Sequence, residues 1–191
     1  MDETELIRLL KARDRATWNQ VLRDHGPRLV GYATRMLGDR GRAEDVVQTS
    51  LMSVMRSIDR FEGRSSLRSW LFRAVHNAAI DELRRGARYV ELVSEDEDPL
   101  AGAFGADGRW QQPVAAWSLD ERIDAHRLLA LVHDEMDRLP HAHREILLLR
   151  ETHGLDNAEL AEALGVSAGN ARIRLHRARQ ALRAAVTRRM E

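Results

Sequence analysis

The chain has 191 residues, 43% of them hydrophobic, which is enough for one ordinary domain or two small ones with packed cores. Its 30 basic and 30 acidic side chains cancel, so net charge by itself indicates no particular class of partner. Cysteine is absent, which excludes disulfide frameworks, thiolate zinc sites and thiol nucleophiles.

The N-terminal Met-Asp-Glu-Thr-Glu lacks the basic and apolar stretches of a signal peptide, and no apolar run is long enough to span a bilayer. We therefore expect a soluble, cytoplasmic protein with no direct membrane insertion. Apolar residues recur at helical spacing almost throughout, and no sustained alternating run rich in β-branched residues occurs. The sequence predicts an all-α fold.

Four helices are expected in the first 88 residues. The first stops at Gly26-Pro27, where the proline begins a second helix that Gly38 ends. The third covers about residues 42–58, and Ser66 caps a fourth that ends in a basic run.

The third predicted helix has a polar face that also carries methionine. Its members lie at helical spacing and are Asp45, Gln48, Thr49, Met52 and Met55. Methionine on a surface is unusual, and is used where a partner must be gripped adaptably. The pattern alone leaves two interpretations open, a protein-binding surface and an ordinary solvated face.

Aromatic, amide and basic residues cluster around the start of the fourth predicted helix. Phe61, Trp70 and Asn77 are interleaved with arginines. This mixture suits single-stranded DNA, whose unstacked bases lie on aromatic faces while an amide reads an exposed edge. Trp70 is better interpreted as a core residue, and for Asn77 a structural hydrogen bond is the competing interpretation.

Helical periodicity stops between Arg88 and Ser118, where glycines, prolines and acidic residues gather. We predict a flexible acidic linker over residues 89–117, between small helical domains at residues 1–88 and 118–191. Its aromatic residues either pack loosely on a domain or become ordered on a partner; they are Phe104, Trp110 and Trp117. Ser118 and Glu121 have the spacing of a capping box, which would open the second domain.

A helix-turn-helix is predicted near the C-terminus. Gly165 can end its first helix in a left-handed conformation, and Ser167 can cap its second. The residues expected to face outward are Asn170, Arg172, Ile173, Arg174, His176 and Arg177. The second helix has many arginines and no acidic residue before Glu191, which indicates a surface that meets DNA phosphates.

Several fragments, in this order, resemble the extracytoplasmic-function sigma factors of bacterial RNA polymerase. They are Ala43-Glu-Asp-Val-Val-Gln48, the stretch from Arg60 to Arg85, Leu139-Pro with Arg144-Glu, and Leu-His-Arg-Ala-Arg179. The resemblance covers almost the whole chain.

This resemblance implies a role for each surface. The clamp coiled coil of core RNA polymerase would dock on Asp45, Gln48, Thr49, Met52 and Met55. The minus-ten promoter element, as a melted strand with a flipped base, would be held by Phe61, Gly63, Arg64, Ser65, Ser66, Asn77, Arg84, Arg85 and Arg88. The minus-thirty-five element, as duplex, would be read by Ser167, Gly169, Asn170, Arg172, Ile173, Arg174, His176 and Arg177. The polymerase flap and an anti-sigma factor are further implied partners, and an anti-sigma factor would account for any sequestration at the membrane.

Some positions depart from the family pattern. Thr49, Leu51 and Met55 stand where Glu, Phe and an aromatic residue are usual, and residues 168–171 differ from the commoner Val-Gly-Thr-Val. The fine docking contacts and the promoter sequence therefore cannot be carried over from the family.

A helix-turn-helix regulator that binds duplex DNA without polymerase is the alternative function, and an enzyme is the third class. His141 and His143 are the residues that suggest a metal, but their spacing points the rings to different sides of a helix. The sequence has no His-Glu-x-x-His, phosphate loop or nucleophile elbow. We expect no catalytic activity, metal or cofactor.

Overall fold

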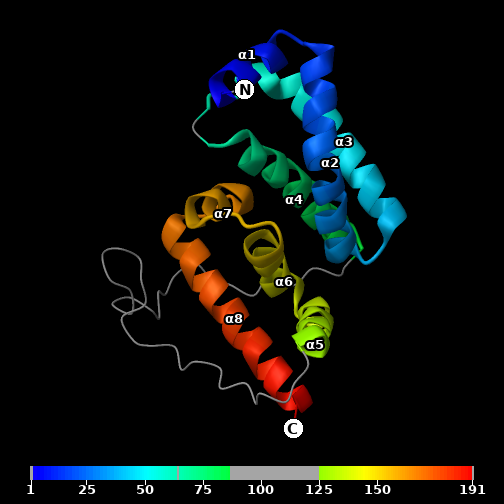
Figure 1. Cartoon of the computed structure of the whole chain (residues 1–191), viewed down its shortest axis with the longest axis vertical. Helices are drawn as coiled ribbons and strands as arrows, with labels where there is room; N and C mark the ends of the chain where they lie inside the picture. Colours follow the sequence, from blue (N-terminus) through cyan, green and yellow to red (C-terminus); the bar gives the residue numbers. More distant parts are fainter. Residues whose placement is uncertain (1, 64, 87–124, 191) are drawn as a thin grey trace.

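The computed structural model describes residues 2–63, 65–86 and 125–190, which form helices and no strand (Figure 1). The first half contains α1 (Glu3–Lys11), α2 (Arg15–Leu37), α3 (Arg40–Ser57), the 3-10 turn η1 (Ile58–Arg60) and α4 (Leu67–Arg85). The second half contains α5 (Ala125–Arg138), α6 (His141–Leu147), the π-helical turn η2 (Leu148–Thr152), α7 (Asn157–Leu164) and α8 (Ala168–Met190). The predicted all-α class is confirmed.

The first helical boundary was predicted wrongly. Gly26-Pro27 does not separate two helices, because Pro27 lies inside a continuous α2. Chain reversal occurs earlier, at Arg13, whose φ of 61° is left-handed, and Asp14 then caps α2 by accepting a hydrogen bond from the Thr17 amide at 2.7 Å.

Burial explains why α2 continues through the proline. Trp18 and Val21 before it, and Leu29 and Tyr32 after it, are all buried in one core. Pro27 itself is exposed, so water can serve the carbonyl that loses its helical hydrogen bond. Packing of both halves of α2 against α3 and α4 thus outweighs an unfavourable local preference of about 3 kcal/mol.

The helix-turn-helix forms as predicted. Gly165 ends α7 with a φ of 66°, and the Ser167 hydroxyl accepts a hydrogen bond from the Asn170 amide at 3.2 Å. At the other end of α7, Asp156 and Glu159 form a reciprocal capping box. Both ends of this short helix are therefore fixed by local hydrogen bonds.

The two halves of the chain pack directly on each other. Helix α7 lies against α4, and α6 contacts α2 (Figure 1). One cluster of buried apolar side chains runs from Leu10 in the first half to Ala178 in the second. The predicted linker and the Ser118 capping box lie outside the described residues, so the domain boundaries stay predictions.

Candidate polymerase and nucleic-acid interface

The predicted protein-binding face on α3 is mostly exposed. Asp45, Gln48 and Thr49 lie at the surface, and Met52 is 47% exposed. Met55 differs from the expectation, because its side chain is half-buried and packs on the hydrophobic core. An exposed surface with one large apolar side chain remains available for a partner.

An ion-pair network lines the groove between α3 and α4 beside this face. Glu82 accepts hydrogen bonds from Arg42 of α3 and lies 3.0 Å from Arg85 of its own helix. The hydrogen bond from Arg42 lowers the pKa of Glu82. Asp45 and Thr49 line the same groove. The network thus joins α3 to α4 beside the exposed face of α3.

The loop before α4 is built on a buried aromatic pair. Phe61 is only 4% exposed, and its ring lies 5.0 Å from that of Trp70, which packs partly against the core. The expectation that Phe61 presents its ring to a base is therefore wrong in this arrangement, because the ring supports the loop from below. Ser65 and Ser66 are partly exposed, and Gly63 has a φ of 72°.

Farther along α4, the side chains of Asn77 and Arg84 line a polar cavity together with His76. Arg85 is exposed at the end of the helix. Arg64 and Arg88 lie outside the described residues. Asn77, Arg84 and Arg85 are thus exposed on one helix, and their role in holding a strand stays a prediction.

The second helix of the helix-turn-helix, α8, carries the other predicted DNA surface. Ser167 and Gly169 are exposed, and the partly exposed members are Asn170, Arg172, Ile173, His176 and Arg177. Arg174 was predicted to face outward, but its side chain is buried. It is 8% exposed, and its Nη1 lies 3.9 Å from Oε1 of the buried Glu145 on α6. Arg174 belongs to the face of α8 that packs on α6.

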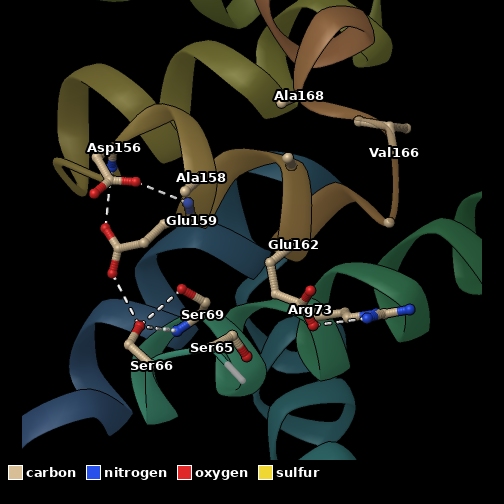
Figure 2. Close-up of a pocket in the computed structure, with 12 residues that line it drawn as sticks. Ser65, Ser66, Ser69, Arg73, Asp156, Ala158, Glu159, Glu162, Val166 and Ala168 are labelled. Atoms are coloured by element: carbon tan, nitrogen blue, oxygen red, sulfur yellow. Dashed lines mark hydrogen bonds and ion pairs between the residues drawn. The ribbon is translucent and has the colours of Figure 1, made fainter. Parts of the chain in front are cut away.

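Helix α7 covers part of the predicted single-strand surface on α4. Glu159 accepts a hydrogen bond from the Ser66 hydroxyl at 2.9 Å, and Glu162 pairs with Arg73 at 2.7 Å. These contacts border a cavity of about 590 Å³ between the two helices (Figure 2). We call this α4–α7 interface the seam. In the seam, the carboxylates of Glu159 and Glu162 in the second half thus bind the Ser66 hydroxyl and the Arg73 guanidinium in the first half.

A polar and aromatic cluster lies deeper between the two halves. The Tyr32 hydroxyl and His76 Nδ1 are 2.9 Å apart, and Nδ1 also lies 4.0 Å from Glu145. His153, from the end of η2, packs its ring on Tyr32 and Phe72. Burial, followed by nearby arginines, lowers the pKa values of both His76 and His153 to about 4. Both rings are therefore neutral at physiological pH.

Comparison with known proteins decides the family. Residues 21–89 match sigma-70 region 2, and residues 129–182 match sigma-70 region 4. The chain is 32% identical over 159 residues to the RNA polymerase sigma factor CarQ of Myxococcus xanthus, with 83% of each chain covered. It is 30% identical over 173 residues to the ECF RNA polymerase sigma factor SigL of Mycobacterium tuberculosis, with 90% of each covered. The chain belongs to the extracytoplasmic-function family of sigma factors.

Two other proteins share part of the length or the fold of this chain. This sigma factor spans 60% of the length of a third relative, the ECF sigma factor SigE of Mycolicibacterium smegmatis, at 30% identity. Its fold is similar to that of the sigma factor RpoE of Bartonella quintana, solved in complex with the anti-sigma factor NepR. The TM-score is 0.60 at 24% identity, with 88% of this chain and 96% of that one covered.

Sequence reasoning missed the residues that join the two halves of this sigma factor. Arg73 pairs with Glu162, Glu159 accepts a hydrogen bond from Ser66, and Glu145 lies 4.0 Å from His76, and each of these contacts forms only when the second half packs on α4. Glu159 also has a capping-box spacing with Asp156 that is visible in the sequence. Its second contact, with Ser66, is not.

Among residues 2–63, 65–86 and 125–190, no group of three or more His, Asp or Glu side chains is arranged to hold a metal ion. Within the same ranges, the sigma factor has no helix with both the length and the apolar character of a membrane span.

Proposed function

We propose that this sigma factor binds core RNA polymerase and directs promoter-specific initiation by reading two promoter elements in different forms. The minus-thirty-five element is read as duplex by α8, and the minus-ten element is held as melted strand by α4 and its preceding loop. The carrying observation is that one chain combines an exposed α3 face with a polar, basic α4 and an acid-free α8, in the regions that match sigma-70 regions 2 and 4.

The start of α8 suits major-groove recognition. A helix fits the major groove of B-DNA, and its first turns carry the side chains that reach base edges. Here Ser167, which precedes α8, and Asn170, Ile173 and Arg177 on its partly exposed face combine hydrogen-bonding, apolar and cationic groups. Additional arginines toward the C-terminus supply phosphate contacts, which position the helix without specifying sequence.

The surface of α4 suits an unpaired strand. Asn77 offers an amide that can pair with the edge of a base, and Ser65 and Ser66 offer small donors at a helix start. Arg84 and Arg85 add positive charge at the far end of the helix for the backbone.

Two protein partners belong to this proposal. Asp45, Gln48, Thr49 and Met52 would meet the clamp coiled coil of the polymerase, while the second half meets the flap. An anti-sigma factor would hold the protein inactive, at the membrane if that factor is itself anchored there. The similarity to a sigma factor solved with an anti-sigma factor supports this part.

Access to the single-strand surface requires the seam to open. Ser66 and Arg73 are engaged by α7, and the cavity next to Asn77 is lined on its other side by Gly165, Val166 and Arg174. Asn77 is exposed, but a strand that also contacts Ser66 and Arg73 would have to displace α7. We infer that polymerase binding separates the two halves.

Transcription with purified core polymerase tests the proposal. A library of templates with randomised upstream regions is transcribed by core alone, by core with this protein and by core with the Asp45→Ala, Gln48→Ala variant. We expect specific start sites only with the unmodified protein, and enrichment of two spaced sequence elements. Transcripts no more specific than those of core alone would reject a sigma function and favour a helix-turn-helix regulator that acts without polymerase.

A further inference from the structure

Helix α1 lies outside residues 21–89, the part of the chain that matches sigma-70 region 2, yet it contacts η1 and the first residue of α4, which flank the loop before α4. That loop connects η1 to α4 and carries Ser65 and Ser66. Its Gly63, with a φ of 72°, permits backbone conformations that other residues resist. Such a loop needs contacts from outside itself to hold one conformation.

Glu3 of α1 fixes the end of this loop. Its Oε1 accepts a hydrogen bond from the backbone amide of Leu67, the first residue of α4, at 2.8 Å. The first amides of a helix have no partner within it, and Ser66 satisfies a second one by accepting from Ser69 at 3.1 Å. A carboxylate is also favourable at the positive end of the α4 dipole. Glu3 and Ser66 thus cap α4 together.

Arg13, just beyond α1, fixes the start of the loop. Its guanidinium pairs with Asp59 of η1 at 2.6 Å and donates a second hydrogen bond to the Met55 carbonyl. The left-handed φ of Arg13 turns the chain at this point, so that α1 runs back beside η1. One short segment, residues 3–13, therefore contacts the chain both before and after the loop.

The core holds α1 firmly enough to act as a support. Leu10 is fully buried, and its carbonyl accepts a hydrogen bond from Trp18 Nε1 at 3.2 Å. Leu6 and Ile7 pack half-buried against the same core. A displacement of Glu3 would therefore disturb apolar packing as well as one hydrogen bond.

We propose that α1 positions the minus-ten recognition loop, and that Glu3 is a positioning residue for promoter specificity, through the backbone of Leu67. This inference rests on the proposed function, because it assumes that the loop and α4 hold the melted minus-ten strand. Glu3 does not need to touch DNA. It keeps the start of α4, and with it Ser65 and Ser66, in the geometry that distinguishes one base from another.

The test measures how holoenzyme discriminates between two single-stranded oligonucleotides, one with the preferred minus-ten sequence and one with it scrambled. The unmodified protein is measured first; if it shows no preference, the proposed function fails and not the role of Glu3. With Glu3→Ala, we expect discrimination to fall by about three- to tenfold, as for the loss of one helix cap. Glu3→Gln keeps an acceptor oxygen and should retain most of it.

Two further variants separate positioning from other roles. Glu5→Ala removes a carboxylate of the same helix that pairs with Arg8 three residues farther on, and should leave discrimination unchanged. Asp59→Asn weakens the other anchor and should lower discrimination in the same direction as Glu3→Ala, which keeps the test decisive if Glu3→Ala folds poorly.

Thermal unfolding and duplex minus-thirty-five binding are recorded for every variant. Unchanged discrimination in both Glu3→Ala and Asp59→Asn would overturn the proposal. Equal tightening on both oligonucleotides with Glu3→Ala would overturn it too, because Glu3 would then only repel phosphate. Loss of minus-ten discrimination with intact minus-thirty-five binding is the result that supports it.

Discussion

Arg73 on α4 and Glu162 on α7, 89 positions apart in the sequence, form an ion pair with an Nη1–Oε1 distance of 2.7 Å. Both side chains are partly exposed, so the pair contributes modestly to stability, about 0.2 to 1 kcal/mol. Its position matters more than its strength. The pair joins α7, the first helix of the helix-turn-helix, to α4, the helix that we propose holds the melted strand.

Reversing one charge of this pair should open the seam. Arg73→Glu places like charges together and should shift the balance toward separated halves by about two- to fivefold, while Arg73→Glu with Glu162→Arg should restore it. Distance distributions between labels on α3 and α8 measure the effect. Arg40→Glu, which alters an exposed pair within α3, is the matched control. Failure of the double variant to recover would show that the pair does not hold the seam.

Acid should weaken the contact between the halves. The pKa of His153 is lowered from 6.5 to about 4 by burial, with Arg68, Arg28 and Arg35 adding to the effect. A ring released to water regains the ordinary pKa, so the separated or unfolded state binds more protons. The stabilisation is complete above pH 6.5 and is lost as the pH falls toward about 4.

Melting temperature measured across this pH range tests the linkage. His153→Phe keeps an aromatic ring against Tyr32 and Phe72 but cannot titrate, so its melting temperature should fall less on acidification. Part of the slope should remain, because the pKa of His76 is also lowered to about 4 by burial. His133→Phe on α5 controls for the replacement of a histidine by phenylalanine elsewhere in the protein. A slope identical to that of the unmodified protein would assign the pH dependence to other groups.

Arg174 should act on stability and not on sequence preference. Arg174→Ala leaves the carboxylate of Glu145 buried without its nearby cation, which costs about 3 kcal/mol or more. Arg174→Met with Glu145→Leu removes both charges and should recover much of that loss. Urea unfolding gives the free energies. A stable Arg174→Ala variant with impaired promoter binding would instead return this residue to the DNA surface.

Arg177, on the same helix, should affect DNA sequence preference and not stability. It is partly exposed in the first half of α8, so Arg177→Ala should leave urea unfolding unchanged. Duplex binding should weaken by about 1 to 3 kcal/mol with relaxed preference at one base pair, if the guanidinium makes a bidentate base contact. Arg188→Ala, near the exposed end of α8, should weaken all sequences equally. The same uniform loss with Arg177→Ala would identify a phosphate contact.

Docking on polymerase should depend on the exposed face of α3. Asp45→Ala with Gln48→Ala should lower the affinity for core polymerase by about tenfold, since each removes a polar group from an interface. Circular dichroism should be unchanged, because both side chains are at the surface. Ser53→Ala, also exposed on α3, is the control. Equal affinities of all three proteins for core would place the docking surface elsewhere.

Local chemistry determined much of this protein from the sequence alone. Ser66, Gly165 and Ser167 cap or end helices through contacts within a few residues, so their roles could be predicted without the fold. The exposed face of α3 follows from helical spacing for the same reason.

Only the tertiary structure decided the remaining features, because they depend on residues far apart in the chain. Burial of both ends of α2 carries the helix through Pro27, against the local preference. Arg174 is buried beside Glu145, and the buried ring of Phe61 packs on that of Trp70. The seam between α4 and α7 joins groups that no sequence spacing relates, since partners for Ser66 and Arg73 exist only once the two halves pack together.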